Sequence, residues 1–325
     1  MTFPFDFYAA AFGAAFGLSW LTLPWWRRRC LRTGLVDDPG QRKIHAEPIP
    51  LAGGFAVLTG LLLPLAAGVC WLESGWLRAG STGLILHGLD RRGGELLVLA
   101  GGAVAITILG WLDDRHELKA LPKFLGQLLV AVAVATVCKR ITLFVPSTGF
   151  SYAVTILWML TVMNAFNFMD NMNGLCAGLG ALGALEFGLL AAGRGEYLVA
   201  ITGFLMAGAL AGFLPWNFPH AKAFLGDAGS HLVGYLLGVM AILPHFYTKL
   251  NPRPLAVLAP LFILAVPLLD LAQVSVYRTV RGKPFWLGDT NHLSHRLTRA
   301  GLSRPRAVLV LWLASLAIGL IAFAL

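Results

Sequence analysis

Amide side chains and one acid gather between residues 164 and 174, in the run Asn-Ala-Phe-Asn-Phe-Met-Asp-Asn-Met-Asn-Gly. Four Asn and one Asp stand there within eleven residues, between two hydrophobic stretches. In a helix, Asn164, Asn167 and Asp170 are three residues apart and share one face. Such a polar face at the end of a hydrophobic stretch is costly unless it holds water, an ion or a ligand. The run therefore predicts a binding site.

Two adjacent acids, Asp113 and Asp114, form a second cluster, and Lys123 follows nine residues after Asp114. A solvated helix end is the simpler interpretation. The alternative is a divalent-cation or phosphate site, because Mg²⁺ takes carboxylate oxygens and shares the phosphates of its substrate. Lys123 would then return to the same site as a phosphate-binding point charge.

A third acid, Asp227, stands between Gly226 and Gly229 just before another hydrophobic stretch. An ordinary helix cap, supplied by Asp227 or Ser230, explains the acid. It does not explain the glycines, which let a backbone approach a phosphate or a metal closely.

Basic residues and histidines form two further clusters. One follows Asp37-Asp38 and contains Arg42, Lys43 and His45; the other contains His292, His295 and Arg296. The first is explained either as a turn-rich basic loop or as a phosphate-facing loop, and the second either as a solvated basic loop or as a zinc site. A zinc site at the two histidines needs more ligands than this pair supplies.

Taken together, the clusters supply acids and amides for a metal and Lys, Arg and His for an anion. That is the inventory of phosphoryl transfer, where positioning and charge neutralisation do most of the work. Two other classes stay open. In a secondary transporter, Glu186 and Asp270 would couple ions, although such acids should cluster at the bilayer midplane within inverted repeats. A non-catalytic scaffold would need none of these acids.

Membrane helices must position these clusters. Of the 325 residues, 57% are hydrophobic and only 13% are charged, against about 25% charged in soluble domains. The hydrophobic blocks are near 20 residues long, which suits a hydrocarbon core of ~30 Å. We predict an all-α, polytopic membrane protein with one domain, residues 1–325, and about ten spans. The predicted spans are 5–26, 51–72, 96–112, 122–138, 152–169, 174–193, 196–214, 229–246, 254–274 and 306–325.

The polar clusters all fall on one side of these spans. The loops on that side hold 17 of the 25 Lys and Arg, so the positive-inside rule makes that side cytoplasmic. The first basic residue, Arg27, follows the first hydrophobic stretch, which is not the pattern of a cleavable signal. The net charge of +9 then reflects orientation and attraction to anionic membrane lipids. Nucleic-acid binding is not expected, because no soluble basic domain carries it.

In this order, the clusters resemble the motifs of the polyprenyl-phosphate N-acetylhexosamine-1-phosphate transferases. The resemblance covers residues 37–297 through an RKxH…P…GG loop, the acid pair, NxxNxxD and FxGDxGS. It implies ten or eleven helices around a cytoplasmic cleft in the bacterial inner membrane. It also implies Mg²⁺-dependent transfer, with Mn²⁺ as an alternative, of a sugar-1-phosphate from a UDP-N-acetylhexosamine to undecaprenyl phosphate, releasing UMP. A homodimer stays open.

The same resemblance assigns roles by position. It places Asp227 and Asn167 on the metal, and Lys123 on a phosphate. It gives Asp113 and Asp114 either activation of the lipid phosphate or the metal shell.

Asp170 would act near the nucleotide, according to the resemblance. The chain departs from the DGxDG pattern, since it has Asn171 and Asn173 in place of Gly and Asp, and from HxHH, since Ser294 fills the third position. The phospho-MurNAc-pentapeptide translocases usually carry a denser histidine run, so the chain is more similar to the enzymes that initiate O-antigen and teichoic acid linkage. The residues expected to bind substrates are Arg42, Lys43, His45, Asn164, Asn173, His292, His295 and Arg296.

Overall fold

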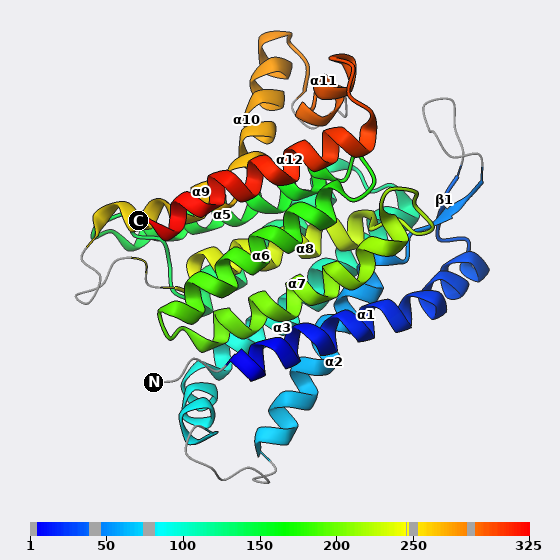
Figure 1. Ribbon diagram of the computed structural model, residues 1–325. Helices are drawn as coiled ribbons and strands as arrows, with labels where there is room; N and C mark the ends of the chain where they lie inside the picture. The colour runs from blue at the N-terminus through cyan, green and yellow to red at the C-terminus, as the bar shows by residue number, and fades with distance from the viewer. Residues whose placement is uncertain (1–4, 39–46, 74–81, 245, 247–252, 285–289) are drawn as a thin grey trace.

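The computed structural model describes residues 5–38, 47–73, 82–244, 246, 253–284 and 290–325. Nearly all of the regular structure is helical, as predicted, and the helices form one bundle (Figure 1). The α-helices of the described residues are α1 (Phe5–Thr33), α2 (Gly53–Glu73), α3 (Thr82–His116), α4 (Ala120–Val137), α5 (Thr148–Met169), α6 (Leu175–Gly193), α7 (Tyr197–Asn217), α8 (Gly226–Ile242), α9 (Ala259–Ile263), α10 (Ala265–Val280), α11 (Leu293–Arg299) and α12 (Arg304–Gly319).

Shorter elements complete the described chain. They are the 3-10 helices η1 (Pro254–Leu258) and η2 (Leu320–Phe323) and the strands β1 (Val36–Asp37) and β2 (Ile49–Pro50). The two strands pair antiparallel, with Val36 opposite Pro50 and Asp37 opposite Ile49. This small ribbon holds Asp37 at one end of the bundle (Figure 1).

Eight helices in the described residues are long and apolar enough to cross a membrane, and the bent pair around Leu264 makes a ninth. The remaining predicted span, 229–246, corresponds to α8, which begins earlier, at Gly226, and ends at Ile242. Its 17 residues reach only about 25 Å at ~1.5 Å per residue. The helix is short because it is enclosed by protein, with every residue from Ala228 to Ile242 buried. The chain is a multi-pass membrane protein.

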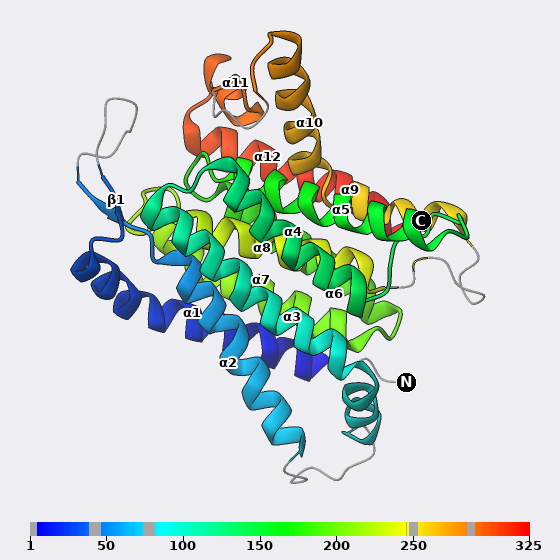
Figure 2. The same cartoon turned by 180° about the vertical axis from the view of Figure 1, so that it is seen from behind.

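The predicted span over 254–274 is bent rather than straight. The chain breaks at Leu264, and the helices before and after it differ in direction by 74°. Pro267 stands in the first turn of α10, where it lacks the N–H that would continue the preceding helix, and its ring crowds the carbonyl four residues earlier. After the break, α10 stands out from the bundle together with α11 (Figures 1 and 2).

The predicted span 96–112 is longer than its hydrophobic core suggests. The helical backbone is interrupted at Arg92, and a membrane-length helix then runs to His116. Because the helix continues for four residues past position 112, it carries Asp113 and Asp114 on its last turn.

Small residues let α8 pack closely against its neighbours. A side chain on Gly110 of α3 would collide with the backbone of Asp227 and Ala228, and one on Gly54 of α2 with the backbone at Gly229. Close backbone approach through small residues is the usual way in which membrane helices associate. Here it brings the acidic end of α3 against the first turn of α8.

Candidate active site

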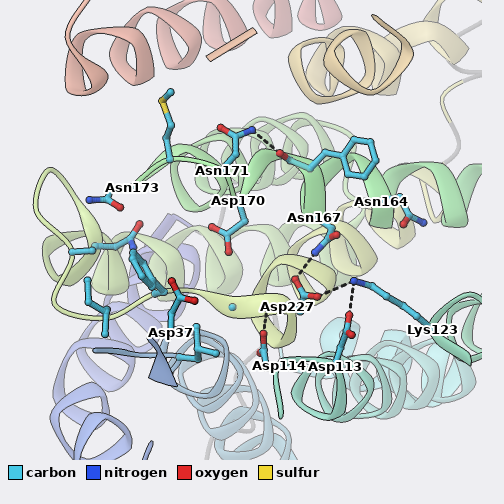
Figure 3. A pocket seen from close by; sticks show the side chains of 18 of the residues that line it. Asp37, Asp113, Asp114, Lys123, Asn164, Asn167, Asp170, Asn171, Asn173 and Asp227 are labelled. Carbon is cyan, nitrogen blue, oxygen red and sulfur yellow. Dashed lines mark hydrogen bonds and ion pairs between the residues drawn. The ribbon is translucent and has the colours of Figure 1, made fainter. Parts of the chain in front are cut away.

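Lys123 joins acids from two helices. Its Nζ lies 2.5 Å from Asp113 Oδ2 and 2.8 Å from Asp227 Oδ2, and all three side chains converge in Figure 3. Asp113 ends α3, Lys123 opens α4, and Asp227 opens α8. The prediction that Lys123 returns to the acid pair therefore agrees with the geometry, although its observed partners are carboxylates.

Asp114 has a different environment from Asp113. Its Oδ1 accepts a hydrogen bond from the Asp227 backbone N–H at 2.8 Å, and its Oδ2 accepts one from Ala228 N–H at 3.0 Å. These N–H groups belong to the first turn of α8, where a helix has no internal partners for its donors. Asp114 thus caps α8 from outside and fixes the backbone that carries Asp227.

Gly226 is required by this cap. Its φ is +72°, a value that disfavours side chains, and a Cβ here would lie 2.8 Å from Asp114 Oδ2. The helix is not capped by Asp227 or Ser230, because its N-cap is Leu225, without a side-chain hydrogen bond. The simpler sequence interpretation of this cluster is therefore wrong: the cap comes from α3, 113 residues earlier.

The amides of α5 complete the centre. Asn167 Nδ2 donates to Asp227 Oδ1 at 2.7 Å and to Ser230 Oγ at 3.0 Å. One turn earlier, Asn164 Nδ2 donates to Gln127 Oε1 at 2.9 Å. Both amides line the same cavity, as their spacing predicted. Asp170 lines it as well, but as the residue that caps the end of α5 rather than as part of the helix.

The neighbouring acids affect the pKa of Asp170. Burial, together with the charges of Asp227 and Asp114, raises its pKa to about 8. Four carboxylates (those of Asp113, Asp114, Asp170 and Asp227) therefore share a site in which Lys123 is the neighbouring cation. The repulsion between these acids contributes to the raised pKa of Asp170, and a bound cation would relieve it.

The donor set suits a hard cation. Among the described residues, no group of three or more His, Cys, Asp or Glu side chains is arranged to hold a metal by itself. Mg²⁺, however, is usually bound by one or two carboxylates together with substrate phosphates and water. Asp227, with the Asn167 amide beside it, meets that requirement, so the residues present fit the ion.

One cavity of about 1920 Å³ joins two chemically different regions. Near Asp37 and Asn173 its walls are polar, and Phe218 and His220 lie there too. Figure 3 shows Asp37 and Asn173 on the opposite side of Asp227 from Lys123 and Asn164. Beyond Lys123 the walls are apolar, formed by Leu121, Phe124, Leu157 and Leu160. Leu121 and Leu157 are 65% and 64% exposed, so this region is open to the side of the bundle.

The predicted substrate-binding residues are not all at the cavity. Asn173 and His295 line it, whereas His292 and Arg296 are not part of its wall. His292 is buried, and Arg296 is exposed on α11. Arg42, Lys43 and His45 lie outside the described residues.

The two histidines do not form a zinc pair. His292 caps α11, and its Nδ1 lies 2.6 Å from Asp270 Oδ2. The ring of His295 is 6.2 Å from that of His292. Burial lowers the pKa of His295, and His292, Arg304 and Arg299 lower the pKa further.

Asp270 is a residue that the sequence interpretation misplaced. It was assigned to ion coupling in a transporter, but it binds the start of α11 through His292 and through Leu293 N–H, which is 2.6 Å from Oδ1. The other transporter candidate, Glu186, is buried beside Gly319 of α12, and neither of its oxygens has a hydrogen-bond partner among the described residues.

Asp37 was noticed in the sequence but not assigned to the site. It lines the cavity, and its charge contributes to raising the pKa of Asp170. In the sequence, the only signal was the position of Asp37 next to the basic loop. That Asp37 lines the cavity is apparent only from the structure.

Comparison with known proteins agrees with this arrangement. The family model of glycosyl transferase family 4 matches residues 96–245, which contain the acid pair, the amide run and Asp227. A probable undecaprenyl-phosphate N-acetylglucosaminyl 1-phosphate transferase of Bacillus subtilis is 30% identical over 92% of this chain and 80% of its own length. The chain belongs to the family of this relative, the polyprenyl-phosphate N-acetylglucosaminyl 1-phosphate transferases.

Other relatives are also named as transferases of N-acetylglucosamine phosphate to a polyprenyl phosphate. A decaprenyl-phosphate N-acetylglucosaminephosphotransferase of Mycolicibacterium smegmatis is 34% identical over 94% of this chain and 78% of its own length. An undecaprenyl-phosphate alpha-N-acetylglucosaminyl 1-phosphate transferase of Escherichia coli is 28% identical over 89% and 76%, respectively. The resemblance to the polyprenyl-phosphate N-acetylhexosamine-1-phosphate transferases is thereby confirmed, and it is favoured over the transporter and scaffold alternatives.

Proposed function

We propose that this protein transfers N-acetylglucosamine-1-phosphate from the UDP-sugar to a polyprenyl phosphate and releases UMP. One observation carries the proposal: the cluster of Asp113, Lys123, Asn167 and Asp227 lies where the polar and apolar regions of a single cavity meet. A nucleotide sugar suits the polar region and an isoprenoid suits the apolar one. The relatives are named for the transfer of N-acetylglucosamine phosphate and for a polyprenyl phosphate, which supports this transferred group and this acceptor.

In the proposed reaction, an oxygen of the lipid phosphate attacks the sugar-bearing phosphorus of the donor. A new P–O bond forms there, the bond to the bridging oxygen breaks, and UMP departs with that oxygen. The lipid phosphate is largely ionised near neutral pH, since the second pKa of a phosphate monoester is about 6. No strong general base is needed, so Asp113 has an orienting role.

The protein's part is positioning and charge. Asp227 and Asn167 would hold Mg²⁺, which supplies neutralisation of the diphosphate when bound. Lys123, already between Asp113 and Asp227, attracts the attacking phosphate. Asp114 keeps Asp227 in place through the α8 backbone. The exposed leucines of the cavity let the isoprenoid enter from the bilayer.

The proposal includes location and biological role. We expect the cavity at the cytoplasmic face of a bacterial inner membrane, because the loops on its side carry most of the Lys and Arg. The reaction there would initiate an envelope glycan, such as O-antigen or a teichoic acid linkage unit.

UMP release by the purified protein tests the proposal. We expect release that requires undecaprenyl phosphate, Mg²⁺ and UDP-N-acetylglucosamine together. Asp227→Asn should abolish it, whereas Asp6→Asn, an exposed acid in the first turn of α1, should not. Absence of release with a full panel of UDP-N-acetylhexosamines, from folded protein in lipid, would refute the assignment.

A further inference from the structure

A buried hydrogen bond joins two segments that are 123 residues apart. Ser294 is fully buried, and its Oγ donates to Asn171 Oδ1 at 2.6 Å. Asn171 Nδ2 donates in turn to the carbonyl of Phe168, also at 2.6 Å (Figure 3). The end of α5 therefore fixes the amide so that its oxygen faces Ser294.

The segment that carries Ser294 cannot hold its own shape. α11 has only seven residues, far fewer than an isolated helix needs in water. Asp270 binds its start, and Gln273 donates to the Asn291 carbonyl at 2.9 Å. Those bonds tie α11 to α10, which itself stands out from the bundle (Figures 1 and 2). On the cavity side, α11 contacts α12, and the ring of His292 lies 5.6 Å from that of Phe168 on α5. The Ser294–Asn171 bond adds a hydrogen bond between α11 and the cavity wall.

The two ends of this bond lie beside residues of the proposed active site. Asn171 directly follows Asp170, and both line the cavity. Ser294 directly precedes His295, which lines the cavity as well. Glycine, common in the family pattern at position 171, has no side chain to accept this bond, so the connection depends on the residues found in this chain.

We propose that Asn171 and Ser294 form a positioning pair that holds His295 against the donor part of the cavity, where it contacts the anionic diphosphate-sugar. The inference rests on the proposed function. Neither residue of the pair takes part in the chemistry. Without their bond, α11 stays attached to α10 but no longer keeps His295 at the cavity wall.

Steady-state kinetics of Ser294→Ala, Asn171→Ala and the double variant test the pair. We expect each single variant to raise the KM for UDP-N-acetylglucosamine about tenfold, the cost of losing a buried hydrogen bond, while the KM for undecaprenyl phosphate stays within twofold. The KM of the double variant should be no higher than that of the worse single variant, because each single variant already removes the same Ser294–Asn171 hydrogen bond. Thr298→Ala is the matched control, since that hydroxyl donates to the His295 carbonyl within α11.

Hydrogen exchange provides a readout that does not need turnover. Amides of 293–299 should exchange faster in both single variants than in the wild type. Ser294→Cys, which keeps the side-chain size and a weak donor, should fall between wild type and Ser294→Ala and covers the case in which alanine impairs folding. Unchanged exchange, an unchanged donor KM, or multiplied losses in the double variant would overturn the pair. A wild-type protein without UMP release would instead refute the proposed function, and the exchange result would still decide whether the bond holds α11.

Discussion

Replacing Asp114 by Asn tests how the site holds Asp227. In the wild type, both carboxylate oxygens accept backbone N–H groups of the first turn of α8, at 2.8 and 3.0 Å. Hydrogen bonds to a charged group contribute roughly 1.5–3 kcal/mol each. An Asn side chain keeps one neutral bond and turns its own NH₂ group toward the second N–H. We therefore expect a loss of about 3 kcal/mol in the interaction that fixes this turn.

We expect the lost interaction between Asp114 and α8 to lower kcat. If the start of α8 shifts, Asp227 moves with it, and about 3 kcal/mol corresponds to a more than hundredfold lower kcat. The Mg²⁺ concentration for half-maximal activity should rise too, while the KM for the donor changes little. UMP release over a Mg²⁺ titration measures both quantities. Asp6→Asn controls for the lost charge, and a kcat of Asp114→Asn within threefold of wild type would refute the positioning argument.

Other variants probe single features of the site. Lys123→Met leaves Asp113 and Asp227 without the ammonium between them, so the melting temperature should fall without Mg²⁺ and should rise more on adding Mg²⁺ than in the wild type; equal Mg²⁺ shifts would contradict this. Asp170→Asn should abolish UMP release yet raise the melting temperature. The carboxyl has a pKa of about 8 in the folded protein and of about 4 in the unfolded chain. It therefore weakens the folded state increasingly as the pH rises between these two values. The gain should be larger at pH 8 than at pH 5, and equal gains in thermal scans at the two pH values would show that the carboxyl is well solvated in the folded state. Leu157→Asn should raise the KM for undecaprenyl phosphate, and Leu313→Asn, equally exposed on α12 but away from the cavity, should leave it unchanged; equal effects would argue against the apolar region as the lipid entrance.

The helices themselves were predictable from the sequence. Hydropathy determined them because a membrane leaves a chain few alternatives to helices that satisfy their own hydrogen bonds. The amide face of α5 was predictable as well, since Asn164 and Asn167 are one turn apart on one helix. Their common direction is a local property that needs no tertiary contact.

Contacts between distant segments were not predictable in the same way. The sequence showed Asp113 and Asp114 as an equivalent pair, but the close packing of Gly110 on α8 separates their roles: one faces Lys123 and the other caps a helix. Similarly, Asp270 looked like a membrane acid until the break at Leu264 turned α10 and brought α11 onto it. The sequence by itself determined which residues are available and on which side of the membrane they are expected. The tertiary structure decided which of them meet, because a helix can present a carboxylate at its end but only packing selects the partner.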